Sequence, residues 1–366
     1  MKALTKSQGS RKAVWVAGVF ALAIAVVIGL SGCSGGSSES SDSSVPDAYK
    51  NLDSVTLIAA DSTGKGAAGQ LWGQSFAQHV SDDTGGKITV EYHPNGELGG
   101  DTDLLRQEQS NDIQMVVTQP ATEVSFVKDL AVFDDPMAFA NYDADQIDKV
   151  LNGDNKFTKK LQSAFEDAGF HNLGWLQAGT FRVTTSNKDL SKLSDFKGFQ
   201  IRTMENSNNM AFWSALGAEP TPLAFSEVYF ALQNGTVDGQ ENATDTCVGS
   251  SFQEVQKYLA NTKHTLYVNN ISINKDTWDS LDPAYQDAIN KAVEEATEDI
   301  QPQITKMNKE SIKTMTDAGM KVIDYDQDFF DQVLALDGVK KVYSDVSKQT
   351  DGLSDTMIDL LKKTKK

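Results

Sequence analysis

The sequence predicts an α/β protein in which two lobes enclose a ligand cleft. Three observations lead to this prediction: residues 55–92 follow a strand–helix–strand pattern, two later segments repeat the order helix, turn, strand, and a long helical pattern covers residues 283–318. Strands that alternate with helices are typical of α/β proteins, in which helices cover a mostly parallel sheet.

The size and charge of the chain narrow its class. Its 366 residues are enough for two domains or for one unusually large domain. An apolar content of 39% and a charged content of 23% are ordinary for a globular protein. The 51 acidic residues outnumber the 33 basic ones and give a net charge of −18. We therefore expect no nucleic-acid partner, because nucleic-acid binding needs a basic surface.

Residues 1–32 have the order of a secretory signal: a basic start, an apolar stretch over residues 13–30 and small residues at the end. Residues 30–33 read Leu-Ser-Gly-Cys, which resembles a bacterial lipobox. We expect cleavage before Cys33 and a lipid anchor on this cysteine. The alternative is an uncleaved transmembrane helix, for which the apolar stretch is long enough.

The segment after Cys33 is rich in Ser and Gly and cannot bury enough surface to fold. We expect residues 33–52 to form a tether and the globular body to begin near Asp53. Loss of the signal removes four basic residues and no acidic one, so the net charge becomes −22. Cys247 is then the second cysteine, and we expect it to be a small core residue.

The first unit of the body covers residues 55–92. Residues 55–60 (Val-Thr-Leu-Ile-Ala-Ala) predict a buried strand that ends in a polar loop at Asp61 and Ser62. A helix follows, because apolar residues recur every three or four positions at Leu71, Trp72, Phe76 and Val80. Two glycines end the helix, and residues 87–92 alternate as a second strand does.

Two later segments share one plan. Residues 104–110 predict a helix that leads into a strand over residues 112–117, followed by Thr118 and Gln119. Residues 228–234 predict a helix with Ser226 as its N-cap, followed by a strand over residues 236–238. Ligands of open α/β sheets bind at the carboxyl ends of strands. From the first lobe we therefore expect ligand contacts from Asp61, Ser62, Thr118 and Gln119.

The long helical pattern over residues 283–318 exceeds what one small lobe needs, and we expect this helix to brace both lobes. Its apolar positions repeat at helical spacing from Ala288 to Ile300. Pro302 is expected to kink or divide the helix, because proline removes a backbone donor and clashes with the preceding turn.

No motif of catalysis or of cofactor binding is present in the sequence. The four histidines are far apart, and the chain has no Gly-x-Ser-x-Gly, no phosphate loop and no Gly-x-Gly-x-x-Gly. Asp324, Asp326 and Asp328 have the spacing of a calcium loop, but Phe329 and Ala335 stand where its Gly and Glu belong. We therefore expect a binding protein and no enzyme, with no cofactor and no metal site.

Several motifs carry a family resemblance. They are Asp-Phe-Lys-Gly-Phe-Gln-Ile-Arg at residues 195–202, the segment 216–229, Gly-Gln-Glu-Asn at 239–242, His-Pro-Asn-Gly-Glu-Leu-Gly at 93–99 and Thr-Thr-Ser-Asn at 184–187. In this order they closely resemble the solute-binding proteins of tripartite ATP-independent periplasmic (TRAP) transporters, the DctP-type family.

The resemblance covers the body from about Asp53 to the C-terminus. It implies a periplasmic-binding-protein-like fold whose two lobes are joined by crossing strands and a long helix. We expect residues 53–179 and about 268–307 in the first lobe, and residues 180–267 and about 308–366 in the second.

The resemblance also implies site residues. Arg202 falls on the central arginine that pairs with the ligand carboxylate, for which the guanidinium fork is well suited; the alternative is a structural ion pair. Arg182 matches a second arginine found in part of the family, with a surface ion pair as its alternative. Asn242 matches a polar ligand contact. Phe225 matches an aromatic wall, with a place in the core as its alternative, and Glu205 is a further expected contact.

By this resemblance we expect a lipid-anchored protein on the extracytoplasmic face of the cell membrane. It would bind an organic acid, either a C4-dicarboxylate or a sugar acid such as a uronate, and deliver it to the small and large membrane subunits of a TRAP permease. The alternatives are a solute-binding protein of an ATP-driven importer and a secreted enzyme or ligand sensor. Ser207 and Ala243 occupy positions where many relatives have Pro, so the resemblance does not assign the chain to one ligand subgroup.

Overall fold

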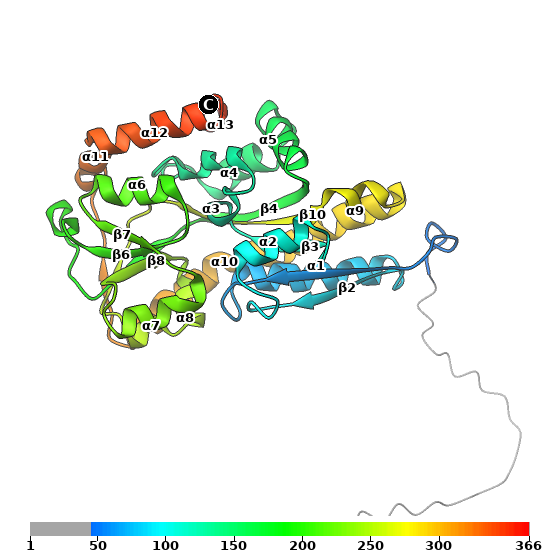
Figure 1. The fold of residues 1–366 in the computed structure, drawn as a ribbon, viewed down its shortest axis with the longest axis horizontal. Coiled ribbons are helices and arrows are strands. Elements are labelled where there is room, and N and C mark those ends of the chain that lie inside the picture. The colour runs from blue at the N-terminus through cyan, green and yellow to red at the C-terminus, as the bar shows by residue number, and fades with distance from the viewer. Residues whose placement is uncertain (1–44, 366) are drawn as a thin grey trace, which may run out of the picture. The chain divides into compact units, whose positions relative to one another are not determined.

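The computed structural model describes residues 45–365, which contain two β-sheets with helices around them (Figure 1). The predicted α/β class with two lobes is confirmed. The predicted signal, most of the predicted tether and Cys33 lie outside the described residues. Among residues 45–365, no helix combines the length and the apolar character needed to cross a membrane.

The first sheet has the strand order β2-β1-β3-β10-β4. Its strands are β1 (Val55–Asp61), β2 (Ile88–His93), β3 (Met115–Thr118), β4 (Phe170–Phe181) and β10 (Leu266–Asn274). β1 pairs in parallel with both β2 and β3, whereas β10 runs antiparallel to β3 and β4. The carboxyl ends of β1 and β3 therefore meet at one edge, where the loop after Asp61 lies near Thr118.

The second sheet has the strand order β11-β9-β5-β8-β6-β7. Its strands are β5 (Val183–Ser186), β6 (Gln200–Thr203), β7 (Glu219–Pro222), β8 (Gly239–Asn242), β9 (Tyr258–Ala260) and β11 (Lys321–Ile323). β6 runs parallel to β7 and to β8. This arrangement places Arg202 and Asn242 near the carboxyl ends of neighbouring strands.

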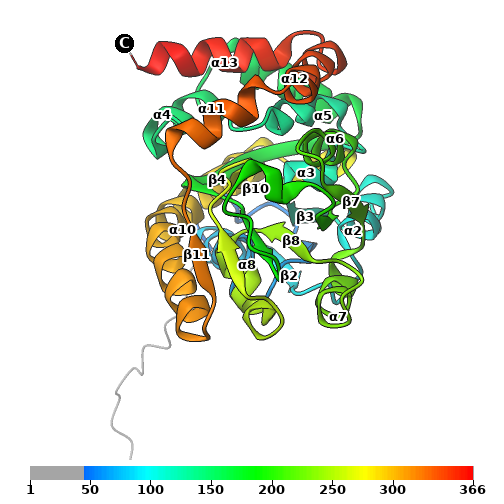
Figure 2. The same cartoon turned by 90° about the vertical axis from the view of Figure 1, so that its left-hand side faces the viewer.

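The chain crosses between the sheets on two adjacent paths. A single residue, Arg182, separates β4 from β5 on the first path, and the return path runs from β9 into β10. Helix α10 (Pro283–Asp317) is a third connection, because it packs on α1 (Ala68–Asp83) and β4 and also on α8 (Thr244–Gly249) (Figure 2). The expected long helix is confirmed, and Pro302 lies inside one continuous helix without dividing it.

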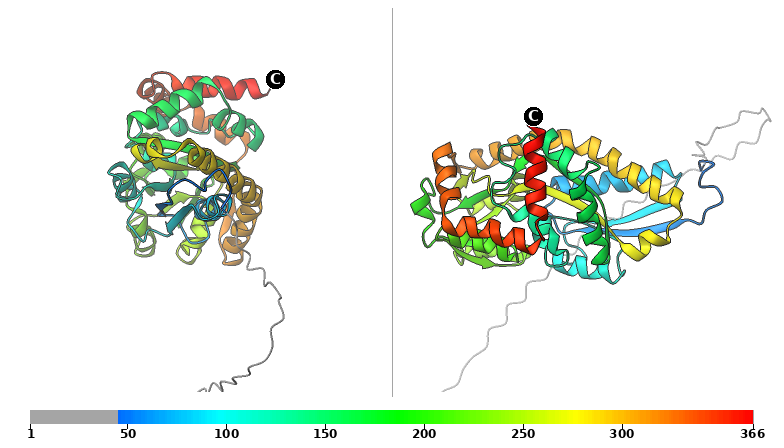
Figure 3. Two further views of the ribbon diagram at one scale, coloured as in Figure 1. Left: turned by 90° about the vertical axis from the view of Figure 1, so that its right-hand side faces the viewer. Right: turned by 90° about the horizontal axis from the view of Figure 1, so that it is seen from above.

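The C-terminal helices cover both parts of the molecule. Helix α12 (Asp337–Gln349) packs on α6 (Ser207–Ala215), while α13 (Leu353–Thr364) packs on α4 (Ala144–Leu151) and α5 (Lys156–Asp167) (Figure 3). Apolar residues of α13 are buried in a core cluster with residues of the first sheet. The sequence predicts that residues 308–366 belong to the second lobe. Because α13 packs on the first sheet's helices and core, we propose that α13 belongs to the first lobe.

The remaining elements are short and lie mostly around the two sheets. They are α2 (Asp101–Gln109), α3 (Pro120–Glu123), η1 (Lys128–Asp134), η2 (Leu193–Phe196), η3 (Phe225–Glu227), α7 (Val228–Gln233), η4 (Phe252–Glu254), α9 (Lys275–Ser280) and α11 (Gln327–Ala335).

The main cores follow the expected apolar faces. Trp72, Phe76 and Val80 of α1 are buried against α10, and Cys247 is fully buried as predicted. Packing onto the body begins before Asp53, because the ring of Tyr49 stacks on that of Tyr285 with the ring centroids 5.7 Å apart. The end of the predicted tether therefore packs on α10 through the ring of Tyr49.

Three local predictions differ from the structure. Ser226 lies inside the 3₁₀ turn η3, and the residue before α7 is Glu227. β8 begins at Gly239 and not at residue 236, because the turn after α7 extends through Val237, whose amide donates to Ala231. β3 begins at Met115 and not at residue 112, because the amides of Asp112 and Ile113 still donate to the carbonyl oxygen of Gln107.

We predict that Gly239→Ala destabilises the fold by at least about 2 kcal/mol, because the added methyl group would clash with the backbone of the paired strand β5, which cannot move without breaking the sheet. A Cβ at Gly239 would lie 2.2 Å from the carbonyl oxygen of Thr185 and 2.7 Å from the ring of Phe199. The measurement is the free energy of unfolding from urea denaturation.

The matched control is Gly174→Ala in β4, where the nearest atom is a methyl group of Val293 at 3.1 Å. A side-chain methyl can yield by a few tenths of an ångström, so we expect a loss within about 1 kcal/mol. Equal losses in the two variants would contradict the proposed backbone clash.

Candidate ligand-binding site

A cavity of about 890 Å³ lies between loops of the two sheets. We call it the outer cavity. A second cavity of about 30 Å³, the inner cavity, shares part of its lining with the outer one and adds Thr118, Gln119, Asn242 and Thr246. Three of these four side chains are buried, so the inner cavity is the deeper end of the site.

Arg202, which the family resemblance makes the central arginine, lines both cavities. Its side chain is 2% exposed, and both Nε and Nη2 donate to the carbonyl oxygen of Leu223, at 3.0 and 2.6 Å. Nη1 is buried and has no hydrogen-bond partner among the described residues. Of the five guanidinium N–H donors, those on the Nη1 side are therefore free to bind a ligand.

Burial lowers the pKa of Arg202 to about 10, and the neighbouring charge of Arg182 acts in the same direction. The guanidinium nevertheless stays protonated at neutral pH. A buried cation with an unused donor is unfavourable unless another group satisfies it. A carboxylate has both the negative charge and the acceptor oxygens that such a group lacks.

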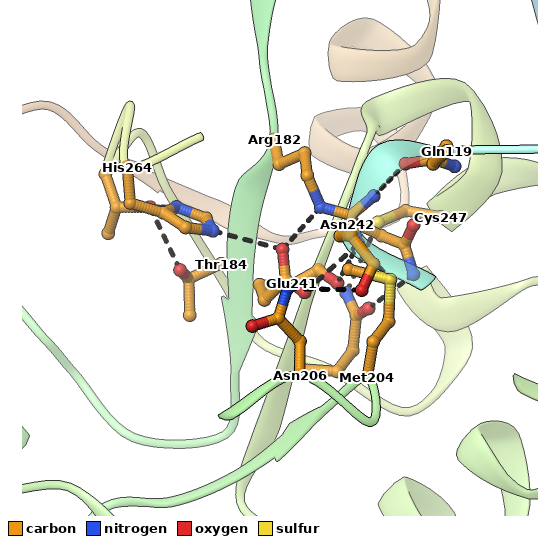
Figure 4. Close-up of polar contacts among 12 residues, drawn as sticks. Gln119, Arg182, Thr184, Met204, Asn206, Glu241, Asn242, Cys247 and His264 are labelled. Carbon is orange, nitrogen blue, oxygen red and sulfur yellow. Dashed lines mark hydrogen bonds and ion pairs between the residues drawn. The ribbon is translucent and has the colours of Figure 1, made fainter. Parts of the chain in front are cut away.

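Arg182 lies behind the inner cavity and lines neither cavity. Its Nε donates to Glu241 Oε2 at 2.5 Å, Nη2 donates to Glu241 Oε1 at 3.1 Å, and Nη1 donates to Gln119 (Figure 4). The expected alternative for Arg182 was a surface ion pair, but this pair is almost completely buried. In this arrangement Arg182 orients Gln119 at the cavity wall.

Glu241 is held as a carboxylate at the centre of a polar network. Burial alone raises its pKa, but the charge of Arg182 and the hydrogen bond from His264 outweigh burial and lower the pKa to about 2. An ionised carboxylate only accepts hydrogen bonds, so His264 donates to it from Nε2 at 3.0 Å. Thr262 contacts the other ring nitrogen of His264 and also Thr184.

The predicted contacts from the first lobe separate into two groups. Ser62 lines both cavities, and Thr118 and Gln119 line the inner one. Asp61 lines neither; its Oδ1 accepts from the Thr63 amide at 2.9 Å and its Oδ2 from Tyr92 at 2.7 Å. Asp61 therefore shapes the loop that carries Ser62.

Apart from Arg182, the predicted contacts from the second lobe all line a cavity. Asn242 lines the inner cavity, and its Nδ2 donates to Gln240 Oε1 at 3.2 Å. Phe225 lines both cavities and meets Phe252 edge to face at 6.3 Å between ring centroids, so it forms a wall of the site as well as an edge of the core. Glu205 lines the outer cavity and is exposed.

Asp101, which the sequence analysis missed, lines both cavities. Its Oδ1 accepts from Ser62 Oγ at 2.5 Å and from Thr118 Oγ1 at 3.3 Å. Burial raises its pKa above the usual range of an aspartate, and these two hydrogen bonds and the charge of Arg202, which favour the ionised form, offset only part of this rise. Asp101 is the first residue of α2, whereas the apolar pattern predicts that this helix begins only at Leu104.

The comparison with known families settles the class of the chain. The family described as bacterial extracellular solute-binding protein, family 7, matches residues 63–345. The chain belongs to this family, and the resemblance to TRAP solute-binding proteins is confirmed.

Individual relatives agree with this assignment. The C4-dicarboxylate-binding periplasmic protein DctP of Rhodobacter capsulatus is 33% identical over 265 residues, which cover 72% of this chain and 76% of that protein. A TRAP periplasmic solute-binding protein from Ochrobactrum anthropi, solved with its C-terminus bound in the ligand pocket, has 30% identity and a TM-score of 0.75, with 86% of this chain and 96% of that chain covered.

The sugar acid binding protein DctPAm of Advenella mimigardefordensis, solved in complex with galactonate, has 25% identity and a TM-score of 0.79. The match covers 86% of this chain and all of that chain.

We predict that Glu241→Gln destabilises the protein by about 3–5 kcal/mol, because it leaves the buried charge of Arg182 without an ionised partner. The free energy of unfolding from urea denaturation measures this loss. Asp154→Asn is the control: it breaks the exposed pair with Lys159 and should change the stability by less than about 1 kcal/mol. Similar losses in both variants would show that the buried network does not need its charge.

Proposed function

We propose that this protein is the extracytoplasmic solute-binding protein of a TRAP transporter and that it captures an organic acid. The observation that carries the proposal is the buried guanidinium of Arg202, whose Nη1 has no partner among the described residues and which lines both cavities. A carboxylate is the ligand group that best satisfies a planar guanidinium.

The class of acid is a C4-dicarboxylate or a sugar acid such as a uronate. The names of the relatives support both classes, since one is a C4-dicarboxylate-binding protein and another holds galactonate. Conversion of the ligand forms no part of the proposal, and the role is capture and delivery.

Binding in this proposal couples to closure of the two lobes. The ligand contacts Arg202 from the second lobe and Ser62 and Thr118 from the first, so it stabilises the closed state more than the open one. The two crossing segments between the sheets are the natural hinge, because they are the shortest connections between the lobes. The closed protein would then deliver the acid to the small and large membrane subunits of the permease, usually driven by an ion gradient.

The acidic surface does not oppose this role. At physiological ionic strength the Debye length is about 8 Å, so distant surface carboxylates are largely screened from the cleft. A hydrogen bond between charged groups contributes about 1.5–3 kcal/mol. Two such bonds from Arg202 outweigh the screened repulsion between the protein and an anionic ligand.

The proposal includes a lipid anchor on Cys33. Its support is the Leu-Ser-Gly-Cys sequence at residues 30–33, which follows an apolar stretch and precedes a segment rich in Ser and Gly. A diacylated cysteine would hold the protein at the outer face of the cell membrane.

We predict that Arg202→Ala weakens binding of the cognate acid by about 100-fold or more, because two charge-assisted hydrogen bonds are lost. Arg202→Lys should lose most of the affinity as well, since an ammonium group cannot reproduce the planar fork. A thermal-shift screen with dicarboxylates, uronates, sialic acids and aromatic acids selects the ligand, and calorimetry then gives the Kd.

Lys340→Ala is the control for net charge, because Lys340 is an exposed base on α12 that lines neither cavity. It should bind as the unchanged protein does. A loss of affinity of less than about tenfold in Arg202→Ala would refute the assignment, and stabilisation by no carboxylate at all would refute the proposed function.

We predict that globomycin, which blocks lipoprotein signal cleavage, causes a larger precursor to accumulate in the producing cell. Cys33→Ser should likewise release the protein from the membrane fraction or leave it uncleaved. Gel mobility and membrane fractionation are the measurements. An unchanged pattern under globomycin would contradict the lipid anchor and favour the uncleaved helix.

A further inference from the structure

The inner cavity has a simple charge balance. Among the residues that line it, Arg202 is the only base and Asp101 is the only acid. The other lining residues are neutral. A ligand that fills this cavity therefore meets one cationic group and one anionic group.

Asp101 is oriented by the protein and keeps one oxygen available. Ser62 and Thr118 both donate to its Oδ1, which fixes the carboxyl group against the first sheet. Its Oδ2 makes no hydrogen bond with any residue of the described part of the chain, and the side chain is half-buried at the wall of both cavities. The group that completes Asp101 must therefore be a hydrogen-bond donor.

The neutral side chains around Asp101 favour a hydroxyl group as this donor. Ser62, Thr118, Gln119, Thr122 and Asn242 can each both donate and accept hydrogen bonds. A hydroxyl group also does both, whereas an ammonium group only donates. Several hydroxyl groups along a short carbon chain match this lining better than one ammonium group does.

We propose that the ligand is a hydroxylated monocarboxylic acid whose carboxylate binds Arg202, and that a ligand hydroxyl donates to Asp101, which excludes a second carboxylate from this end of the site. This inference rests on the proposed function and narrows it to the sugar-acid class. A second carboxylate beside Asp101 would bring two acceptors of like charge together and leave Asp101 Oδ2 without a donor.

The bases of the outer cavity do not change this balance. Lys65 and Arg106 also line it, but both are exposed. In water their interaction with a ligand carboxylate is weak and screened by salt. Glu205, another exposed residue of the same lining, has the opposite sign.

Two pairs of acids test the proposal, because the members of each pair differ only at the far end of the chain. D-erythronate and meso-tartrate form one pair, and D-galactonate and galactarate form the other; in each, a terminal hydroxymethyl group is replaced by a carboxylate. We expect the purified protein to bind the better monocarboxylate at least about tenfold more tightly than its dicarboxylate partner, as measured by calorimetry.

Asp101→Asn should reduce that preference to less than about threefold, since the amide removes the charge and can donate to a second carboxylate. The matched control is Glu97→Gln in the loop before α2, an exposed acid that lines neither cavity and should keep the full preference. The comparison in the unchanged protein is decisive even where Asp101→Asn proves too unstable to measure.

The outcomes separate this inference from the function on which it rests. If dicarboxylates bind as tightly as their partners or more tightly, and binding still depends on Arg202, only the inference is overturned. The same holds if the protein binds none of the four acids but binds succinate or an aromatic acid. If no carboxylate binds at all, both the inference and the proposed function fail.

Discussion

The site depends on one positive charge beside the cleft, that of Arg202, to which no carboxylate of the described residues bonds directly. Arg182 and Arg202 are both buried, but the ionised carboxylate of Glu241 lies against Arg182 and bonds to it. Within residues 45–365, the hydrogen bonds of Arg202 go only to the carbonyl oxygen of Leu223. An unsatisfied buried cation costs stability. In a binding protein the ligand supplies the missing anion, so the same feature that weakens the empty protein strengthens the complex.

The topology explains how this charge reaches the cleft. Parallel pairing in each sheet gathers the carboxyl ends of the strands at one edge, and both edges contribute to the same cavities. Arg182 lies between β4 and β5, where the chain passes from one sheet to the other. Its contacts with Gln119 of the first part and Glu241 of the second join the two halves behind the ligand site. These contacts connect the cavity wall at Gln119 to strand β8, which carries Glu241.

Local patterns predicted the regular elements well, and they failed where a contact between distant residues decides the outcome. The first strand–helix–strand unit and the long helix appear as expected. The packing of Tyr49 could not be predicted from local pattern, because its partner, Tyr285, lies far away in the sequence. Asp101 was missed because its role comes from Ser62 and Thr118, which the sequence places on other elements. Arg182 was expected as a ligand contact, with a surface ion pair as the alternative; it lines neither cavity, and its ion pair is buried.

The motifs of this chain were sufficient to indicate the family, the two-lobed class and the arginine of the cleft, because these follow from residue types at short spacings along the chain. Which donors of that arginine remain free is a different question. The answer depends on Leu223, Glu241 and Gln119, which reach the two arginines only after the sheets and their crossing segments have formed. Hydrogen-bond partners are set by distance in space, and no spacing in the sequence encodes that distance. The folded arrangement therefore decides which arginine lines the cavities and which one supports the wall behind them.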